Sequence, residues 1–223
     1  SDFMPAAIYR ALSFSPDGSY LLVQTIRKPY SYQVPVSRFP VSYDIYSQSG
    51  KLITNFYNRP LQENIPNGFD AVETGRRSVA WRSDVPATLT WAEAQDGGDP
   101  AVESKIRDRV YQLDAPFTGK PALLAALRNR FSGANWGNSR LAVVFDYWWK
   151  NRNVVTYLID PSKENETPDV LYDRSSEDYY GEPGDFLTVK NSFGSYVLRT
   201  SPDGKKLYLQ GEGYSPEGNK PFL

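Results

Sequence analysis

Residues 14–24, FSPDGSYLLVQ, contain the motif that decides the fold, and residues 200–210, TSPDGKKLYLQ, repeat it. In each copy, Ser-Pro-Asp-Gly precedes a segment that mixes β-prone apolar residues with polar ones. Proline pre-sets φ at the second position of a turn, aspartate supplies a hydrogen-bond acceptor, and glycine tolerates positive φ. A turn of this kind between strand-like segments predicts a β-hairpin. Its recurrence predicts a repeated architecture.

Two degenerate copies of this hairpin lie between the two exact ones. One covers residues 78–91 and the other covers residues 134–145. Aligning Phe14, Trp81, Trp136 and Thr200 gives spacings of 67, 55 and 64 residues. Four-stranded propeller blades recur at roughly 40 to 50 residues, so we expect blades with long loops.

A second hairpin completes each of the first three units. The paired segments are residues 42–46 with 51–56, 109–113 with 121–128, and 154–159 with 170–172. Residues 123–127, LLAAL, favour a helix by propensity, but we expect the strand context to override that preference. A short helix is predicted at residues 99–107, where an aspartate cap precedes Pro100 and Glu103 lies in the first turn.

Composition limits the function classes. The chain has 223 residues, of which 40% are hydrophobic and 14% aromatic, and its formal net charge is −1. We therefore expect no nucleic-acid partner and no membrane partner, because neither a basic surplus nor an apolar run of about 20 residues is present. The first residues do not resemble a signal peptide. Because the chain has no cysteine, cysteine usage does not indicate whether it resides in an oxidising or a reducing compartment.

The sequence also contains no histidine. A Ser-His-Asp triad, a Cys-His pair and a His-ligated zinc site therefore cannot be assembled from these residues, and we expect no catalytic residue, metal or cofactor. The nearest approach to a nucleophile elbow, residues 137–141, lacks the closing glycine and lies in a predicted hairpin turn. The sequence leaves open the hypothesis that two carboxylates form a pair for glycoside hydrolysis, since 26 acidic residues offer many pairs.

Residues 13–18, SFSPDG, together with the strand that follows them, resemble the propeller blades of prolyl-oligopeptidase-type (S9) serine peptidases. Longer strings resemble the glutamyl-endopeptidase-like branch, which is found in bacteria and chloroplasts. These strings are YQVPVSRFP (32–40), IPNGFDAV (65–72), WAEAQDGGDP (91–100), YQLDAPFTG (111–119), RSSED (174–178) and GEGYSPEGNKPFL (211–223). The resemblance covers residues 4–223.

The resemblance implies an all-β fold: a partial β-propeller of about three and a half four-stranded antiparallel blades. We expect one propeller segment over residues 1–223, with blades at 7–60, 75–130 and 131–175 and an incomplete blade at 194–223. In the family, the propeller caps a C-terminal α/β-hydrolase domain that carries the catalytic residues. This chain is therefore expected to be a non-catalytic, substrate-gating and substrate-binding segment. Its partners are then the hydrolase domain of the parent chain and peptide substrates, cleaved after glutamate.

A preference for glutamate requires cationic groups, and arginine suits this role because its planar fork matches a carboxylate. The candidates are Arg27 and Arg38, which bracket the long loop 28–41, and Arg76 and Arg77, which enter the second unit. The alternative is that these arginines are solvated or paired with nearby aspartate and glutamate. The compartment is left open, although the resemblance favours a periplasmic or secreted bacterial protein.

Two other groups of residues have a functional and a structural interpretation. Residues 147–149 with Tyr179 and Tyr180 form either a sugar-stacking platform or inter-blade core packing. Residues 173–185 are acidic and form either a Ca²⁺ site or a solvated loop. The rival function is a stand-alone β-propeller interaction module or a carbohydrate-binding module. A cut propeller exposes apolar faces and strand edges, so we also expect self-association.

Overall fold

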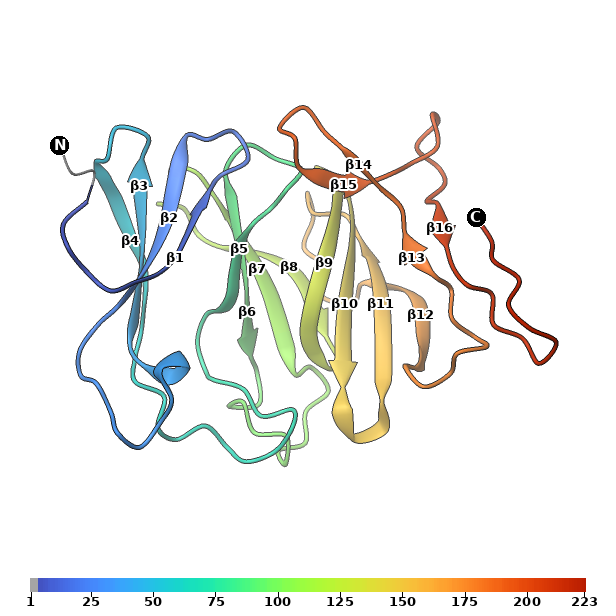
Figure 1. Ribbon diagram of the computed structural model, residues 1–223, viewed down its shortest axis with the longest axis horizontal. Helices are drawn as coiled ribbons and strands as arrows, with labels where there is room; N and C mark the ends of the chain where they lie inside the picture. The colour runs from blue at the N-terminus through green and yellow to red at the C-terminus, as the bar shows by residue number, and fades with distance from the viewer. Residues whose placement is uncertain (1–3) are drawn as a thin grey trace.

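The computed structural model describes residues 4–223, and these form an all-β chain. Three four-stranded antiparallel sheets follow one another along the molecule (Figure 1). The C-terminal residues add two short two-stranded ladders, one above the third sheet and one beyond it. The predicted all-β class and four-stranded antiparallel sheets are confirmed. Helical structure in these residues is limited to two 3-10 turns, Val36–Arg38 (η1) and Trp149–Asn151 (η2). No helix in residues 4–223 has the length and apolar character needed to cross a membrane.

Each four-stranded sheet is a meander, because its strands pair in chain order. The first sheet contains β1 (Tyr9–Phe14), β2 (Tyr20–Ile26), β3 (Val41–Ser47) and β4 (Leu52–Arg59). The second contains β5 (Arg77–Trp81), β6 (Thr88–Ala94), β7 (Asp108–Asp114) and β8 (Ala122–Leu127). The third contains β9 (Arg130–Asn138), β10 (Leu141–Trp148), β11 (Asn153–Ile159) and β12 (Asp169–Ser175).

The two Ser-Pro-Asp-Gly turns adopt one conformation. In the first, the Ser15 amide donates to the Tyr20 carbonyl at 2.9 Å, and the Ser15 hydroxyl donates to Asp17 at 2.6 Å. The Tyr20 amide donates back to the Ser15 hydroxyl oxygen at 3.0 Å, and Gly18 has φ +73°. The second copy repeats these features through Ser201, Asp203, Lys206 and Gly204, with bonds of 3.0, 2.5 and 3.0 Å and φ +70°. The repeated motif is thus a repeated hydrogen-bonded turn.

Two apolar cores hold the sheets together face to face. The first lies between sheets one and two and is formed by Leu22, Val41, Tyr43, Ile45, Phe56, Ala87, Leu89, Trp91, Leu113 and Phe117. The second lies between sheets two and three and is formed by Ala92, Val110, Leu124, Ala125, Leu127, Trp136, Ala142, Val144, Val155, Tyr157 and Ile159. The helix-favouring run 123–127 lies in β8 and supplies three residues to the second core. Burial there overrides helix propensity, as predicted.

The helix predicted at residues 99–107 is wrong, since this segment consists of turns and irregular backbone. The Asp99 carboxylate does accept the Ala101 amide at 2.9 Å, so the capping contact forms without a helix after it. Tertiary contacts explain this: the Arg107 amide donates to the Leu127 carbonyl at 2.9 Å, and the Arg107 guanidinium donates to Asp96 at 2.8 Å. These bonds hold the end of the segment extended against β8.

The last part of the chain forms only short ladders. β13 (Asp185–Phe186) pairs with β16 (Leu209–Gln210), and β14 (Thr188–Lys190) pairs with β15 (Tyr196–Leu198). An isolated bridge joins Thr200 to Leu207 across the second Ser-Pro-Asp-Gly turn. Strand pairing in this region thus begins at residue 185, ahead of the incomplete blade that the sequence predicted at residues 194–223.

Candidate functional site

A cationic cavity of about 570 Å³ opens where the long loop 28–40 meets the end of the first sheet. It is lined by Arg27, Lys28, Pro29, Pro40, Val41, Ser42, Asn58, Arg59, Pro60 and Leu61. Three of these residues are cationic and none is acidic. The wall therefore combines positive charge with proline and aliphatic surface, which suits an acidic group carried on an apolar stem.

Arg27 follows β2 and is held at the rim of this cavity. Its amide donates to the Pro40 carbonyl at 2.8 Å, which closes the base of the loop. Its Nε donates to Ser42 Oγ at 2.9 Å, and its Nη2 lies 3.5 Å from Asp44 Oδ2. The Arg27 side chain is nevertheless 55% exposed. The guanidinium is oriented by its neighbours and still accessible to a ligand.

Arg59 ends β4 and is the buried cation of the cavity. Its Nη2 donates to the carbonyls of Ser37 and Phe39 at 2.8 and 2.7 Å, and its Nη1 lies 3.5 Å from Glu73 Oε2. The Arg59 Nε is buried and has no hydrogen-bond partner among the described residues. One N–H of this guanidinium is therefore left unsatisfied inside the protein.

Arg38 lies beside the cavity without lining it. It ends η1, and its carbonyl accepts the Gln62 amide at 2.9 Å. The two carbonyls that Arg59 binds flank Arg38 on either side, so Arg59 fixes the segment that carries it. No ion pair involves the Arg38 side chain within residues 4–223.

Arg76 and Arg77 lie between sheets rather than at the cavity. Arg76 donates to the Phe56 carbonyl at 2.7 Å, and its guanidinium lies 4.5 Å from the Phe56 ring centre and 4.6 Å from that of Trp91. Arg77 is buried and forms an ion pair with the fully buried Asp108. Burial, with the nearby Arg130 charge, lowers the pKa of Arg77 to about 10. Both side chains are thus occupied by internal partners.

The structure therefore brings Arg27 and Arg38 to the same end of the first sheet. It places Arg76 and Arg77 between sheets, in contact with internal partners. Sequence reasoning missed Lys28 and Arg59 as members of the site. Lys28 could have been found, because it adjoins Arg27 in the same loop. Arg59 carries no local signal, since an arginine before a proline at a strand end is ordinary. Only its contacts with the segment 37–39 reveal its role.

The aromatic group proposed from the sequence is divided by the fold. Trp148 is buried, as core packing predicts. Trp149 is 38% exposed and stacks on Phe69, with ring centres 4.5 Å apart. Tyr179 and Tyr180 line a different cavity together with Tyr214. Within residues 4–223, no group of three or more acidic side chains is arranged to hold a metal ion.

Comparison with known proteins gives two strong sequence matches. The chain is 41% identical over 224 aligned residues, 98% of its length, to a protein of Oryza sativa subsp. japonica named "Probable glutamyl endopeptidase, chloroplastic". It is 40% identical, over 97% of its length, to a protein of the same name from Arabidopsis thaliana. The resemblance to glutamyl-endopeptidase-like proteins is thus confirmed, and these relatives are plant proteins. The chain spans only 24% and 23% of their respective lengths.

Two further comparisons add little. No protein-family model matches the chain. A crystal structure of the uncharacterized protein lmo1340 from Listeria monocytogenes EGD-e covers 75% of this chain and 52% of its own, at 8% identity and a TM-score of 0.28. A likeness at that score supports no argument about fold or function.

Proposed function

We propose that this chain is a non-catalytic β-propeller segment of a prolyl-oligopeptidase-type serine peptidase that cleaves peptides after glutamate. The observation that carries the proposal is the match over nearly all of this chain to about a quarter of two proteins named as probable glutamyl endopeptidases. The chain contains no histidine, so the catalytic triad belongs to another part of the parent protein. The partner is then a C-terminal α/β-hydrolase domain of the parent chain.

The stacking of the sheets supports a propeller. Successive four-stranded meanders pack face to face, as blades do. Their first strands also lie close together: the Trp81 indole N–H at the end of β5 donates to the Ser13 carbonyl in β1 at 3.0 Å. Beyond it, the Arg82 guanidinium lies 4.8 Å from the ring centre of Trp136 in β9. First strands that neighbour one another are expected around a propeller axis.

The cationic cavity supports the proposal that the segment contributes to substrate binding. A glutamate side chain brings one carboxylate and a short apolar stem, and the cavity offers Arg27, Lys28 and Arg59 beside proline and aliphatic surface. Among the four arginines predicted from the sequence, we propose Arg27 and Arg38 for direct contact with the peptide. Arg76 and Arg77 would first have to leave Phe56 and Asp108.

Substitution in the full-length peptidase tests this role. Arg27→Gln removes the accessible guanidinium, so kcat/KM for glutamate peptides is expected to fall roughly tenfold relative to matched glutamine peptides. Arg140→Gln is the control, because Arg140 is 75% exposed on a turn of the third sheet and lies away from the cavity. An unchanged ratio of the two rates in Arg27→Gln would show that the cavity does not read the substrate carboxylate.

A carbohydrate-binding module is the second candidate, and the exposed Phe69–Trp149 stack is the observation that favours it. The coding sequence downstream of Leu223 distinguishes the two. A Gly-x-Ser-x-Gly motif followed by aspartate and histidine supports the peptidase. A stop codon there supports the stand-alone module.

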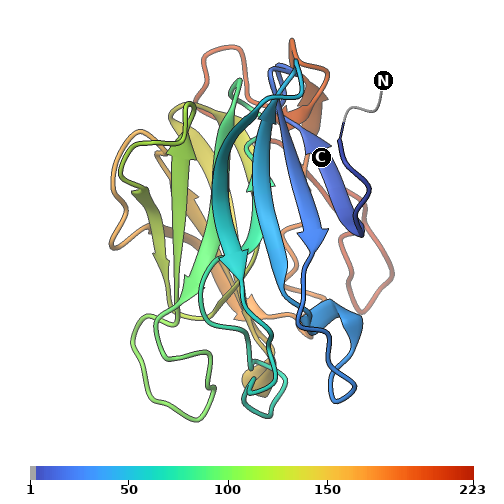
Figure 2. The same cartoon turned by 90° about the vertical axis from the view of Figure 1, so that its left-hand side faces the viewer.

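The proposed segment also has an uncovered face. Ile8, Leu12 and Phe14 are 52%, 53% and 63% exposed, and the first sheet faces the viewer in Figure 2 with no other sheet in front of it. In a complete propeller the next blade covers such a face. For the chain on its own, we propose that a second copy covers it.

A further inference from the structure

The two rims of the stacked sheets carry different kinds of connection. At the lower side of Figures 1 and 2 lies the rim that we call the loop rim, which joins second to third strands and successive sheets. It consists of residues 27–40, 60–76, 95–107, 128–129 and 149–152. The opposite rim, which we call the turn rim, consists of residues 15–19, 48–51, 82–87, 115–121, 139–140 and 160–168. The long irregular connections thus gather mainly on the loop rim.

The even number of strands in each sheet decides where a further domain can be attached. Each sheet is a meander of four strands in chain order, so the chain enters it and leaves it at the same rim, the loop rim. A domain joined to the fourth strand of such a sheet is therefore tethered at the loop rim, whichever sheet carries it. The cationic cavity opens at this rim as well, because its lining residues lie at the ends of β2, β3 and β4 and in the loops beside them.

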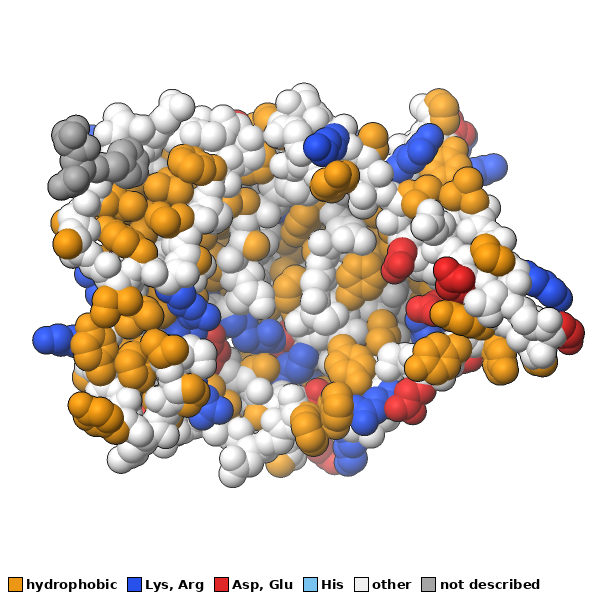
Figure 3. Space-filling view, in the orientation of Figure 1, with side chains coloured by type: hydrophobic (Ala, Val, Ile, Leu, Met, Phe, Trp, Pro, Cys, Tyr) orange, Lys and Arg blue, Asp and Glu red, His pale blue; other side chains and the backbone are white. Residues whose placement is uncertain are grey.

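Exposed apolar side chains are distributed unequally between the two rims. Those on the loop rim are Tyr30, Tyr32, Val36, Phe69, Val102 and Trp149. Within residues 4–223, none of the connections of the turn rim carries an exposed large hydrophobic side chain. Figure 3 shows hydrophobic side chains interleaved with basic ones along the lower side of the molecule. Aromatic residues mixed with arginine are typical of protein interfaces, so the loop rim has the composition of a docking surface.

Phe69 is the most prominent aromatic side chain that is also held in place on this rim. Its side chain belongs to a residue that is 79% exposed, yet the ring stacks on Trp149 with ring centres 4.5 Å apart and an interplanar angle of 25°. The Arg152 guanidinium lies 3.6 Å from the centre of the Trp149 ring. The ring that supports Phe69 is therefore itself held by a cation–π contact.

The backbone on both sides of Phe69 is fixed as well. Gly68 has φ +133°, and a Cβ there would lie 3.1 Å from Pro100 Cγ. The Asp70 carboxylate accepts the Trp149 amide, and the Asp70 carbonyl accepts the Arg130 Nε at 2.8 Å. An aromatic side chain that is already oriented loses little conformational freedom when it binds, which is the property of an interface anchor.

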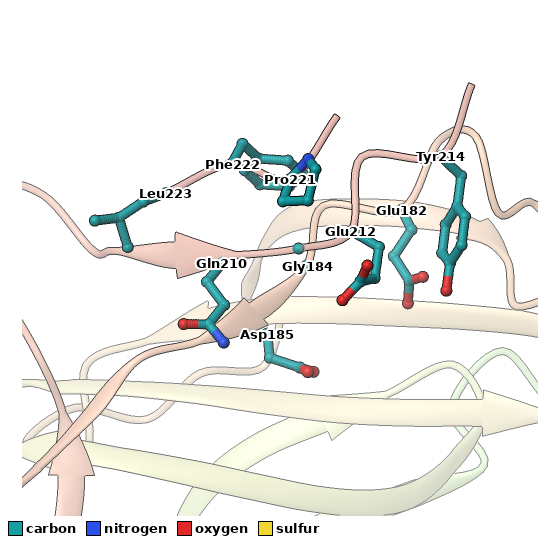
Figure 4. Close-up of a pocket in the computed structure, with 10 residues that line it drawn as sticks. Glu182, Gly184, Asp185, Gln210, Glu212, Tyr214, Pro221, Phe222 and Leu223 are labelled. Atoms are coloured by element: carbon teal, nitrogen blue, oxygen red, sulfur yellow. The ribbon is translucent and has the colours of Figure 1, made fainter. Parts of the chain in front are cut away.

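The cavity shown in Figure 4 lies outside the three four-stranded sheets. It has a volume of about 610 Å³ and lies between residues 182–185 and residues 210–223. These residues belong to the region of the predicted incomplete blade, whose remaining strands are expected to pack there. Every connection of the loop rim, by contrast, has both of its flanking strands in place.

We propose that the loop rim is the face on which the α/β-hydrolase domain of the parent chain docks, with Phe69 inserted into an apolar pocket of that domain. This inference rests on the proposed function and adds to it the docking face and the anchor residue. The relatives are about four times as long as this chain, so they contain room for such a domain. Docking there also places the cationic cavity between the two domains, where a bound peptide faces the residues that cleave it.

Photo-crosslinking of the full-length peptidase tests the docking face. The photoreactive residue p-benzoylphenylalanine replaces Phe69, and mass spectrometry after irradiation and digestion identifies the residues joined to it. Cross-links are expected to the α/β-hydrolase domain of the same molecule. The control carries the same photoreactive residue in place of Arg140, whose side chain is 75% exposed on the turn rim, and is expected to give no cross-link to that domain.

Limited digestion of the full-length peptidase with subtilisin tests the anchor. Phe69→Ser is expected to accelerate cleavage between the two domains roughly tenfold or more, because cleavage follows the population of the opened form. Phe69→Leu keeps an apolar group and is expected to have a smaller effect. Arg140→Ser, on the turn rim, is expected to leave the rate unchanged. Urea unfolding of the 223-residue chain is expected to be nearly the same with and without Phe69→Ser, which separates loss of docking from loss of the fold.

The possible failures are distinguishable. Cross-links to the hydrolase domain from position 140 and none from position 69 would place that domain on the turn rim, which overturns this inference and leaves the proposed function intact. Cross-links from position 69 to a second molecule, or no cross-link from it at all, would overturn the inference in the same way. A parent chain that contains no hydrolase domain would overturn the proposed function and this inference together.

Discussion

Charged residues form a connected network inside the molecule, between the second and third sheets. Asp108 is fully buried and accepts hydrogen bonds from Arg77, Arg130 and the Phe131 amide. Arg130 binds both oxygens of Asp96 at 2.8 Å. Burial acts to raise the pKa of Asp96, but the arginine bonds outweigh it and leave the pKa lowered. The burial of each of these charged groups is therefore compensated by an oppositely charged partner.

At this residue scale, Asp108→Asn is expected to lower the free energy of unfolding by about 3 to 5 kcal/mol, because it leaves the buried Arg77 guanidinium without its counter-charge and removes one of the two carboxylates that pair with Arg130. Urea unfolding measures the change. Glu166→Gln is the control: it breaks a pair with Arg109 in which the two side chains are 36% and 57% exposed, and it should cost less than about 1 kcal/mol. Comparable losses in both variants would contradict a buried, partner-dependent network.

At the scale of elements, hydrogen bonds between long loops join parts of the chain that the sheets do not. Loop 60–76 runs from the first sheet to the second, and its Asp70 carboxylate accepts the Trp149 amide at 3.0 and 3.1 Å. The Arg130 Nε donates to the Asp70 carbonyl at 2.8 Å. The Val72 amide donates to the Gly98 carbonyl at 3.1 Å. Loop 60–76 is thus attached to the second and third sheets.

A pair of adjacent glycines tests how tightly these loops approach. Gly97 and Gly98 both have positive φ, +68° and +75°. A Cβ on Gly97 meets open space, so Gly97→Ala should cost only the conformational strain of about 1 to 2 kcal/mol. A Cβ on Gly98 would collide with the Val72 carbonyl oxygen, so Gly98→Ala should cost clearly more. Urea unfolding compares the two, and equal losses would show that the loops can separate without cost.

The elements could be predicted where their signals are local. Turn residues and apolar patterning located the hairpins, including β8 despite its helix propensity. The predicted helix at 99–107 failed because its capping signals are local, while the contacts of Arg107 with Asp96 and Leu127 are tertiary. For the site, Arg27 was found from its place beside a long loop. Arg59 was not, because it contacts carbonyls 20 and 22 residues away.

At the scale of the whole molecule, the exposed face of the first sheet determines how the chain behaves alone. Leu12 and Phe14 pair across strands with Val23 and Leu21, so they lie on one face. Both remain more than half exposed. Contiguous exposed apolar surface favours association. The proposed second copy would cover it.

Static light scattering tests this association. The 223-residue chain is expected to form dimers, and Leu12→Ser/Phe14→Ser is expected to shift it to monomers by making the face polar. Tyr32→Ser serves as the control, since it removes a fully exposed aromatic residue in the loop 28–40, away from this face. A wild-type chain that is monomeric at all concentrations would rule out the face as a self-association surface.

The contact between Asp70 and Trp149 also has a consequence for synthesis on the ribosome. The two residues are separated by 79 positions in the chain, so Asp70 emerges long before its partner exists. Until the third sheet has been translated, loop 60–76 lacks the bonds from Arg130 and Trp149 that attach it to that sheet. The hydrogen bonds between Asp70 and Trp149 therefore form late in translation, after the second sheet has already been made.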